Sequence, residues 1–282
     1  MVAIAVVQCE IIQYEPETNL RKMEHFIVEA KASKAHLIVF PEDAITGPVE
    51  GNRQFVDFEG KYVQHFQQLA RQYTIDIVPG SIIEGDSDGW YNTTYYIDSA
   101  GTIKGKYRKV HLWHPERTYL TPGNAFSVFE TNYGKVGLII CWDLIFPEAF
   151  RAMVKQDVDI VICPSYWCFE DAGVGLKHHS NAEVVAVNAL CVARAFENEI
   201  ALVFANAATT ELRAGENEEH LIGHSQITVP FKGAVKLLDH THEGMFIQTV
   251  DTAILKDAEI AYGIRKDVLS FKDSQEFNTD IR

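Results

Sequence analysis

Short runs of apolar residues, each about as long as a β-strand, recur along this 282-residue chain and constrain its fold more than any other feature. Segments with the period of an α-helix lie between them. Continuous apolar strands that alternate with helices are typical of a β-sheet whose faces are covered. The runs span residues 3–7, 36–40, 75–79, 136–140, 158–163 and 200–205.

The first helical segment follows Pro16. Its apolar residues recur at spacings of three and four and so share one face, while its charged residues fall elsewhere. These apolar residues are Leu20, Met23, Ile27 and Ala30. Thr18 or Asn19 is placed to cap the helix N-terminus with its side-chain oxygen.

Other strands do not alternate with helices. Residues 95–98 and 102–107 flank Ser-Ala-Gly and predict a hairpin, and three late strands at residues 226–229, 234–238 and 245–250 have no helix between them. The sheets are therefore expected to be mixed, in a fold of the α/β class.

No repeat, low-complexity tract or linker rich in Gly, Ser or Pro divides the chain. A chain of 282 residues with 47% hydrophobic residues can bury a substantial core. We predict one domain over residues 1–266, followed by a polar C-terminal arm over residues 267–282.

The charge of the chain excludes one class of partner. It has 39 acidic and 25 basic residues and a formal net charge of −14. Such a chain repels the phosphate backbone of nucleic acids, so nucleic acid is not an expected partner.

The apolar N-terminus has no basic leader and predicts a first strand instead of a signal peptide. The longest apolar stretch, residues 184–204, is interrupted by charged residues, so we expect no membrane span. The five cysteines are odd in number and have no paired spacing, which suits a reducing compartment and predicts a cytoplasmic protein.

Three chemically reactive side chains stand just beyond three apolar strands. Glu42 follows the strand at 36–40, Lys109 follows the hairpin, and Cys141 follows the strand at 136–140. Strand ends at one edge of an α/β sheet form a shared crevice, so these residues are expected to meet there. Each alone is more often structural or solvated, but the three together predict a catalytic site.

The sequence motifs around these residues, and the order in which they occur, resemble those of the nitrilase superfamily of carbon-nitrogen hydrolases. They are AVVQ, FPED, RKVHL, CWDLIFPE, RAFEN, GHSQI and HEGMF. The resemblance implies a four-layer α-β-β-α sandwich, a homodimer or higher oligomer, and a triad of Glu42, Lys109 and Cys141. It also places a further family glutamate on Glu116.

The implied chemistry needs no cofactor. Glu42 takes the thiol proton, Cys141 attacks a small amide, and Lys109 with the Trp142 backbone N–H stabilises the oxyanion. Lys109 and nearby donors are expected to help hold the thiolate. Glu116 would hold Lys109 or steer the substrate.

Aromatic residues are expected to line the pocket. Tyr166 and Trp167 follow the strand at 158–163, and Trp142 follows the nucleophile. Arg194 and Glu197 in RAFEN are three residues apart on a predicted helix, and we interpret them as a structural ion pair.

The histidines make neither a Cys/His quartet nor the HExxH spacing of a zinc site, so no metal is expected. The pairs considered were His111 with His114, His178 with His179, and His240 with His242.

The preferred substrate is a small linear amide, cleaved to acid and ammonia. The stretch TPGNAFSVFET is similar to the omega-amidase branch, whereas Leu144 and Ile145 after Trp142-Asp143 depart from that branch. An N-carbamoyl amide hydrolase and a nitrilase stay open as alternatives. A catalytically silent scaffold with the same fold is the non-enzyme alternative.

Overall fold

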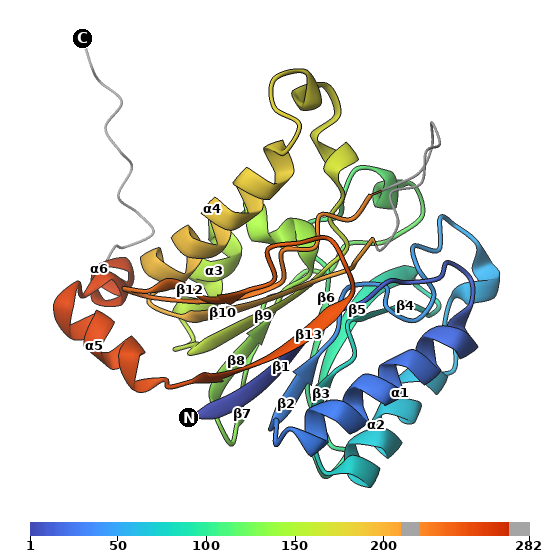
Figure 1. Ribbon diagram of the computed structural model, residues 1–282, viewed down its shortest axis with the longest axis horizontal. Coiled ribbons are helices and arrows are strands. Elements are labelled where there is room, and N and C mark those ends of the chain that lie inside the picture. Colours follow the sequence, from blue (N-terminus) through green and yellow to red (C-terminus); the bar gives the residue numbers. More distant parts are fainter. Residues whose placement is uncertain (210–219, 271–282) are drawn as a thin grey trace.

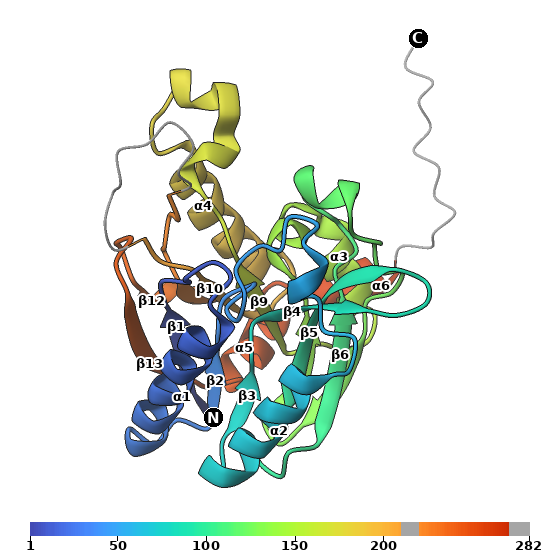
Figure 2. The same ribbon diagram turned by 90° about the vertical axis from the view of Figure 1, so that its right-hand side faces the viewer.

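The computed structural model describes residues 1–209 and 220–270, and it consists of two β-sheets packed face to face between helices (Figures 1 and 2). The first sheet has the order β13-β1-β2-β3-β5-β4, with β6 paired to β5. Its strands are β1 (Val2–Gln8), β2 (Leu37–Val39), β3 (Asp76–Val78), β4 (Ser81–Gly85), β5 (Trp90–Ile97), β6 (Ile103–Arg108) and β13 (Gly244–Val250). Parallel and antiparallel pairs occur together in it.

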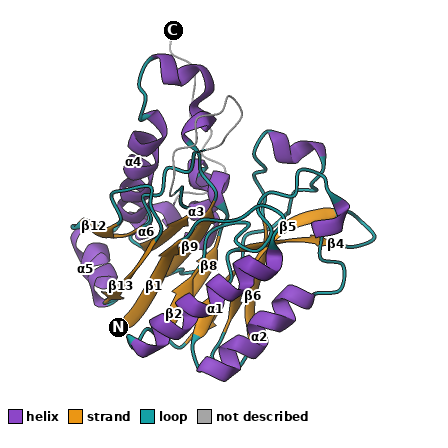
Figure 3. Ribbon diagram, turned by 45° about the vertical axis from the view of Figure 1, so that its right-hand side comes forward, coloured by secondary structure: helices purple, strands orange, loops and turns teal. Residues whose placement is uncertain are grey.

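The second sheet has the order β12-β11-β10-β9-β8-β7 and is also mixed. Its strands are β7 (Val128–Thr131), β8 (Gly134–Leu138), β9 (Ile160–Ser165), β10 (Ala201–Asn206), β11 (Gln226–Val229) and β12 (Gly233–Leu237). Helices α1 (Pro16–Ala32) and α2 (Lys61–Tyr73) cover the first sheet, and α3 (Pro147–Val154) and α4 (Ala182–Glu197) cover the second (Figure 3). The expected four-layer sandwich is confirmed.

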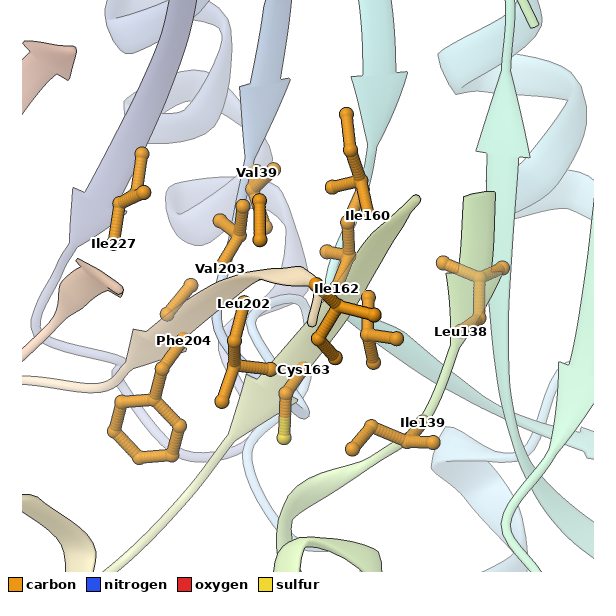
Figure 4. Packing of buried hydrophobic residues seen from close by; sticks show 14 of the residues in the cluster. Val39, Leu138, Ile139, Ile160, Ile162, Cys163, Leu202, Val203, Phe204 and Ile227 are labelled. Atoms are coloured by element: carbon orange, nitrogen blue, oxygen red, sulfur yellow. The ribbon is translucent and has the colours of Figure 1, made fainter. Parts of the chain in front are cut away.

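The alternation of side chains along β1 explains the layers. Ile4 and Val6 belong to the core between the sheets, while Ala5 and Val7 belong to the core beneath α1 and α2. A strand buried on both faces reads as a continuous apolar run, as this sequence does. Figure 4 shows part of the inner core, where Val39 of the first sheet belongs to one cluster with residues of the second.

The predicted strands are confirmed with ends that differ by at most two residues, except that the strand predicted at 95–98 begins five residues earlier, as β5. Strands β4 and β7 were not predicted. The capping prediction for α1 is wrong, because the helix begins at Pro16 with Glu15 at the N-cap position. Asn19 is instead buried inside the first turns, where its amide donates to Ile12 O at 2.8 Å and to Ile45 O at 2.9 Å.

The C-terminal part of the described chain forms α5 (Ala253–Ala261) and α6 (Ile264–Ser270). The start of the predicted arm, residues 267–270, therefore belongs to a helix. Residues 271–282 of that arm lie outside the described residues. None of the helices in the described ranges is both long and apolar enough to cross a bilayer.

Candidate active site

Glu42, Lys109 and Cys141 come from three remote segments and meet at one edge of the sandwich. They follow β2, β6 and β8, respectively. Lys109 Nζ lies 2.8 Å from Glu42 Oε1. The Cys141 Sγ lies 4.0 Å from Tyr166 O, and Tyr166 N donates to Glu42. All three side chains are buried from bulk solvent, yet all three line the same cavity.

Glu42 is held at the junction of the two sheets. Tyr166 N donates to Glu42 Oε2 at 2.9 Å, and Glu42 N donates to Ser165 O at 3.2 Å, so the end of β9 fixes both ends of the residue. Gly80, with φ of +80°, packs against Pro41, where a Cβ would collide with the carbonyl oxygen. Close backbone packing thus fixes the position of the carboxylate.

Cys141 opens the short 3-10 helix η3 (Cys141–Ile145) with a φ of +44°. A non-glycine residue in this left-handed region is strained and needs support from its surroundings. Asp143 supplies that support, because its Oδ2 accepts from Ile140 N at 3.0 Å and from the Tyr107 hydroxyl at 2.7 Å, and its Oδ1 accepts from His111 N at 2.9 Å. Asp143 therefore stabilises the turn that positions the Cys141 thiol.

Arg194 supports the same turn from α4. Its Nε donates to Leu144 O at 3.1 Å and its Nη2 donates to Ile145 O at 2.7 Å. Its Nη1 lies 2.7 Å from Glu197 Oε1, so the predicted ion pair is confirmed. The pair anchors η3 to α4 and has no contact with the cavity.

Glu116 and Asn92 complete the charged cluster. Glu116 Oε2 lies 2.8 Å from Lys109 Nζ and accepts from Trp113 N at 2.6 Å. Asn92 Nδ2 donates to Glu42 Oε1 at 2.8 Å and to Glu116 Oε1 at 3.0 Å. Sequence reasoning missed Asn92, for which the only signal is an amide side chain inside a buried strand.

Burial and charge set the protonation of these groups. Burial raises the pKa of Glu42, and Lys109 opposes this shift. Burial also lowers the pKa of Lys109, but the Glu116 and Glu42 carboxylates outweigh it, so the pKa lies well above its usual value. Burial, together with Glu42, raises the pKa of Cys141 well above that of a free thiol, although Lys109 acts in the expected opposite direction. Lys109 therefore favours the thiolate as expected, but burial and Glu42 act against it and raise the pKa of the thiol.

A cavity of about 350 Å³ opens above the cluster. Trp142, Tyr166 and Trp167, the residues expected to line a pocket, all line it, and Trp113 and Tyr119 do so as well. The Trp142 ring lies 5.6 Å from Trp167 and 4.3 Å from Trp113 between centroids. The walls are aromatic and the floor is charged.

The candidate histidine pairs do not form a metal centre. Across residues 1–209 and 220–270, no group of three or more His, Cys, Asp or Glu side chains is arranged to hold a metal ion. His111 instead stacks on Phe146 with 3.7 Å between ring centroids, and its Nδ1 lies 2.8 Å from Asp143 Oδ1.

The chain is similar to known proteins over nearly its whole length. The family model described as carbon-nitrogen hydrolase matches residues 3–258. A probable nitrilase of Schizosaccharomyces pombe is 34% identical over 95% of this chain and 93% of its own length. The N-carbamoylputrescine amidase of Oryza sativa is 30% identical over 94% of this chain and 91% of its own. The crystal structure of Nit3 of Saccharomyces cerevisiae, described as a member of branch 10 of the nitrilase superfamily, superposes with a TM-score of 0.78 and 25% identity, covering 93% of this chain and 94% of that one.

Proposed function

Because the chain belongs to the carbon-nitrogen hydrolase family, we propose that it cleaves a small linear amide to a carboxylic acid and ammonia through a thioester on Cys141. One observation supports this proposal above the others: Lys109 Nζ is 2.8 Å from both Glu42 and Glu116, and Glu42, Lys109 and Cys141 line the same cavity. A base, a fixed cation and a nucleophile are thereby aimed at one point.

In the first half of the cycle, Glu42 takes the thiol proton as sulfur attacks the amide carbon. The carbonyl oxygen becomes an oxyanion, which the Lys109 ammonium and the Trp142 N–H stabilise. The tetrahedral intermediate collapses when Glu42 returns the proton to nitrogen. The carbon-nitrogen bond breaks, ammonia leaves, and a thioester remains on Cys141.

In the second half, Glu42 takes a proton from water, whose oxygen attacks the thioester carbon. Lys109 again faces the oxyanion, and Glu116 keeps Lys109 in place throughout. The carbon-sulfur bond then breaks, the carboxylic acid leaves, and the proton held by Glu42 returns to sulfur. This route requires no cofactor.

The cavity lining supports neutral or cationic amides over amides with a free carboxylate. Its described residues include one ammonium group, Lys109, which two carboxylates already contact. Acidic side chains predominate: Glu42, Asp43, Glu50, Glu116 and Asp171. Hydrolysis of an N-carbamoyl amine is therefore the second candidate, and the relative from Oryza sativa is named for such an activity.

A screen for ammonia release tests the proposal. It compares short aliphatic amides, omega-amides of dicarboxylic acids, N-carbamoyl amines and nitriles, with the parent protein and Cys141→Ala. We expect turnover of small amides by the parent and none by the variant. Response to nitriles alone would contradict the amide assignment, and no turnover of any compound would favour a silent scaffold.

We also propose that the protein is a homodimer or a higher oligomer. An exposed aromatic cluster joins α4, α5 and the turn between β11 and β12, with the Tyr262 ring 5.0 Å from Phe196 and 5.3 Å from Phe231. Apolar patches of this kind mark interaction surfaces. Light scattering should give at least twice the 31.8 kDa of one chain. Phe231→Glu should shift that mass towards one chain, and a monomeric parent would contradict the assignment.

A further inference from the structure

We propose that Asn92 is a positioning residue for the reaction, which holds the two carboxylates of the site on either side of Lys109 and keeps the base ionised. This inference rests on the proposed role of Glu42 as the base. Asn92 is buried in β5 and does not line the cavity, so it has no path to the substrate except through its neighbours.

Asn92 is bonded to all three charged residues of the cluster. Its backbone carbonyl accepts from Lys109 N at 2.8 Å, where the chain leaves the β5–β6 pairing. Its side-chain Nδ2 donates to Glu42 Oε1 at 2.8 Å and to Glu116 Oε1 at 3.0 Å. Asn92 thus fixes the backbone position of Lys109 and the side-chain orientations of Glu42 and Glu116.

The charge balance gives this contact its function. Two carboxylates face one ammonium, and like charges disfavour the ionised form of each acid. An amide nitrogen carries two hydrogens, so Asn92 can donate one to each carboxylate without adding charge. The opposite orientation would aim its carbonyl oxygen at two acceptors, so the two carboxylates fix the amide.

A hydrogen bond to the ionised form of an acid lowers its pKa. Burial raises the pKa of Glu42 and Lys109 opposes this rise. The bond that Asn92 donates to Glu42 acts in the same direction as Lys109. Glu42 must be ionised to act as base, so catalysis rises with pH through the apparent pKa of the coupled cluster. Removal of the amide should move that acidic limb to higher pH.

Two variants and a matched control test this. Asn92→Leu keeps a similar size and removes both hydrogen bonds, while Asn92→Asp keeps the shape and adds a third carboxylate. The control is Thr93→Val, the next residue of the same strand, which is equally buried and whose hydroxyl makes no hydrogen bond to the described protein groups. The control perturbs the strand without touching the carboxylates.

For both Asn92 variants, we expect the acidic limb of kcat/KM against pH to move up by about one pH unit, so that kcat/KM at a pH on that limb falls by about tenfold. The shift should be larger for Asn92→Asp. Thr93→Val should keep the parent profile. If kcat/KM fell by the same factor at every pH and its acidic limb did not move, Asn92 would have a purely structural role and the proposal would be overturned.

A second measurement needs no turnover and so separates this proposal from the proposed function. The rate of Cys141 alkylation by iodoacetamide is followed against pH, with Cys141→Ala as the blank. The added carboxylate of Asn92→Asp should move the alkylation profile to higher pH than in the parent. If no amide is hydrolysed but this shift appears, the positioning role stands and the reaction is wrong. An unshifted profile in a folded Asn92→Asp protein overturns the positioning role.

Discussion

Two charged networks lie close together in this molecule, and each contains a cation less than 3 Å from a carboxylate. Around Arg194, each guanidinium nitrogen has a partner, which is Glu197 or the backbone carbonyl of Leu144 or Ile145. Around Lys109, the ammonium contacts two carboxylates and faces a cavity. In the first network, the cation is bonded to one carboxylate and two backbone carbonyls. In the second, two carboxylates surround one cation, so one negative charge is in excess.

This difference separates support from chemistry. A cation whose nitrogens are bonded to backbone carbonyls fixes a turn, as Arg194 does for η3. An excess carboxylate next to a buried thiol can take up a proton and then return it. The two networks share η3, since Arg194 holds its end and Cys141 is its first residue. Substitutions in the Lys109 network should therefore affect mainly turnover, and substitutions in the Arg194 network should also lower stability.

The largest effect is expected from removing the base. Glu42→Gln should lower kcat/KM by about 100- to 10,000-fold, because proton transfer to and from sulfur is lost. Its thermal midpoint should stay close to that of the parent, since Lys109 keeps Glu116 as a partner. Ammonia release and thermal denaturation measure the two quantities.

The control for this substitution is Glu243→Gln. Glu243 pairs with Lys22 at the same distance of 2.8 Å, but on the surface. Its loss should change turnover little, because exposed ion pairs contribute little. A Glu42→Gln protein with parental turnover would remove the distinction between the two networks.

The Arg194 network should respond in stability. Arg194→Met leaves the backbone carbonyls of Leu144 and Ile145 without this donor and removes one partner of Glu197, and we expect a loss of about 2–3 kcal/mol in the free energy of unfolding. Turnover should fall as well, because η3 carries Cys141. Urea denaturation gives the first quantity and ammonia release the second.

Arg151 provides a matched comparison, since it pairs with the same Glu197 but is about one-third exposed. We expect Arg151→Met to cost less than about 1 kcal/mol. If both substitutions destabilised the protein equally, the buried contacts to η3 would not be what distinguishes Arg194.

The Lys109 network also predicts that thiol reactivity and turnover change in opposite directions when its base is removed. Burial and Glu42 raise the pKa of Cys141, so iodoacetamide should react slowly at neutral pH and faster as pH rises. Glu42→Gln removes the carboxylate charge, which lowers the pKa of Cys141 and should speed alkylation severalfold, at about tenfold per pKa unit. Turnover and alkylation would then change in opposite directions. Slower alkylation of Glu42→Gln would contradict the electrostatic account.

How much of the fold and of the site could be predicted from sequence depends on how far apart in the sequence the contacting residues are. Apolar runs and strand-end residues are local signals, and they predicted the sheets and the positions of Glu42, Lys109 and Cys141. The contacts of Asn92 and Asp143 join segments remote in sequence, and a single Asn or Asp carries no pattern. The N-cap of α1 was misplaced because Asn19 bonds to the loop at Ile45, a tertiary contact that overrides the local preference.

The smallest expected effect is a gain in stability at the edge of the Lys109 network. Burial, followed by the charges of Glu42 and Glu116, raises the pKa of Asp43 well above its usual value. A carboxyl group whose pKa is higher in the folded state stabilises the fold below its unfolded pKa, and this stability is lost as pH rises through the folded pKa. Asn at this position carries no charge to bury.

We therefore expect Asp43→Asn to be more stable than the parent at pH 7 to 8, by on the order of 1 kcal/mol, with the difference vanishing near pH 4. The φ of +53° at residue 43 also suits Asn. Asp143→Asn is the contrasting variant, because Asp143 accepts hydrogen bonds from Ile140, Tyr107 and His111, and its amide form should destabilise the protein. Thermal denaturation of both variants from pH 4 to 8 decides the matter. A buried carboxylate surrounded by hydrogen-bond donors stabilises the fold, whereas one placed beside other carboxylates destabilises it. If Asp43→Asn were less stable than the parent at pH 7.5, this distinction would be wrong.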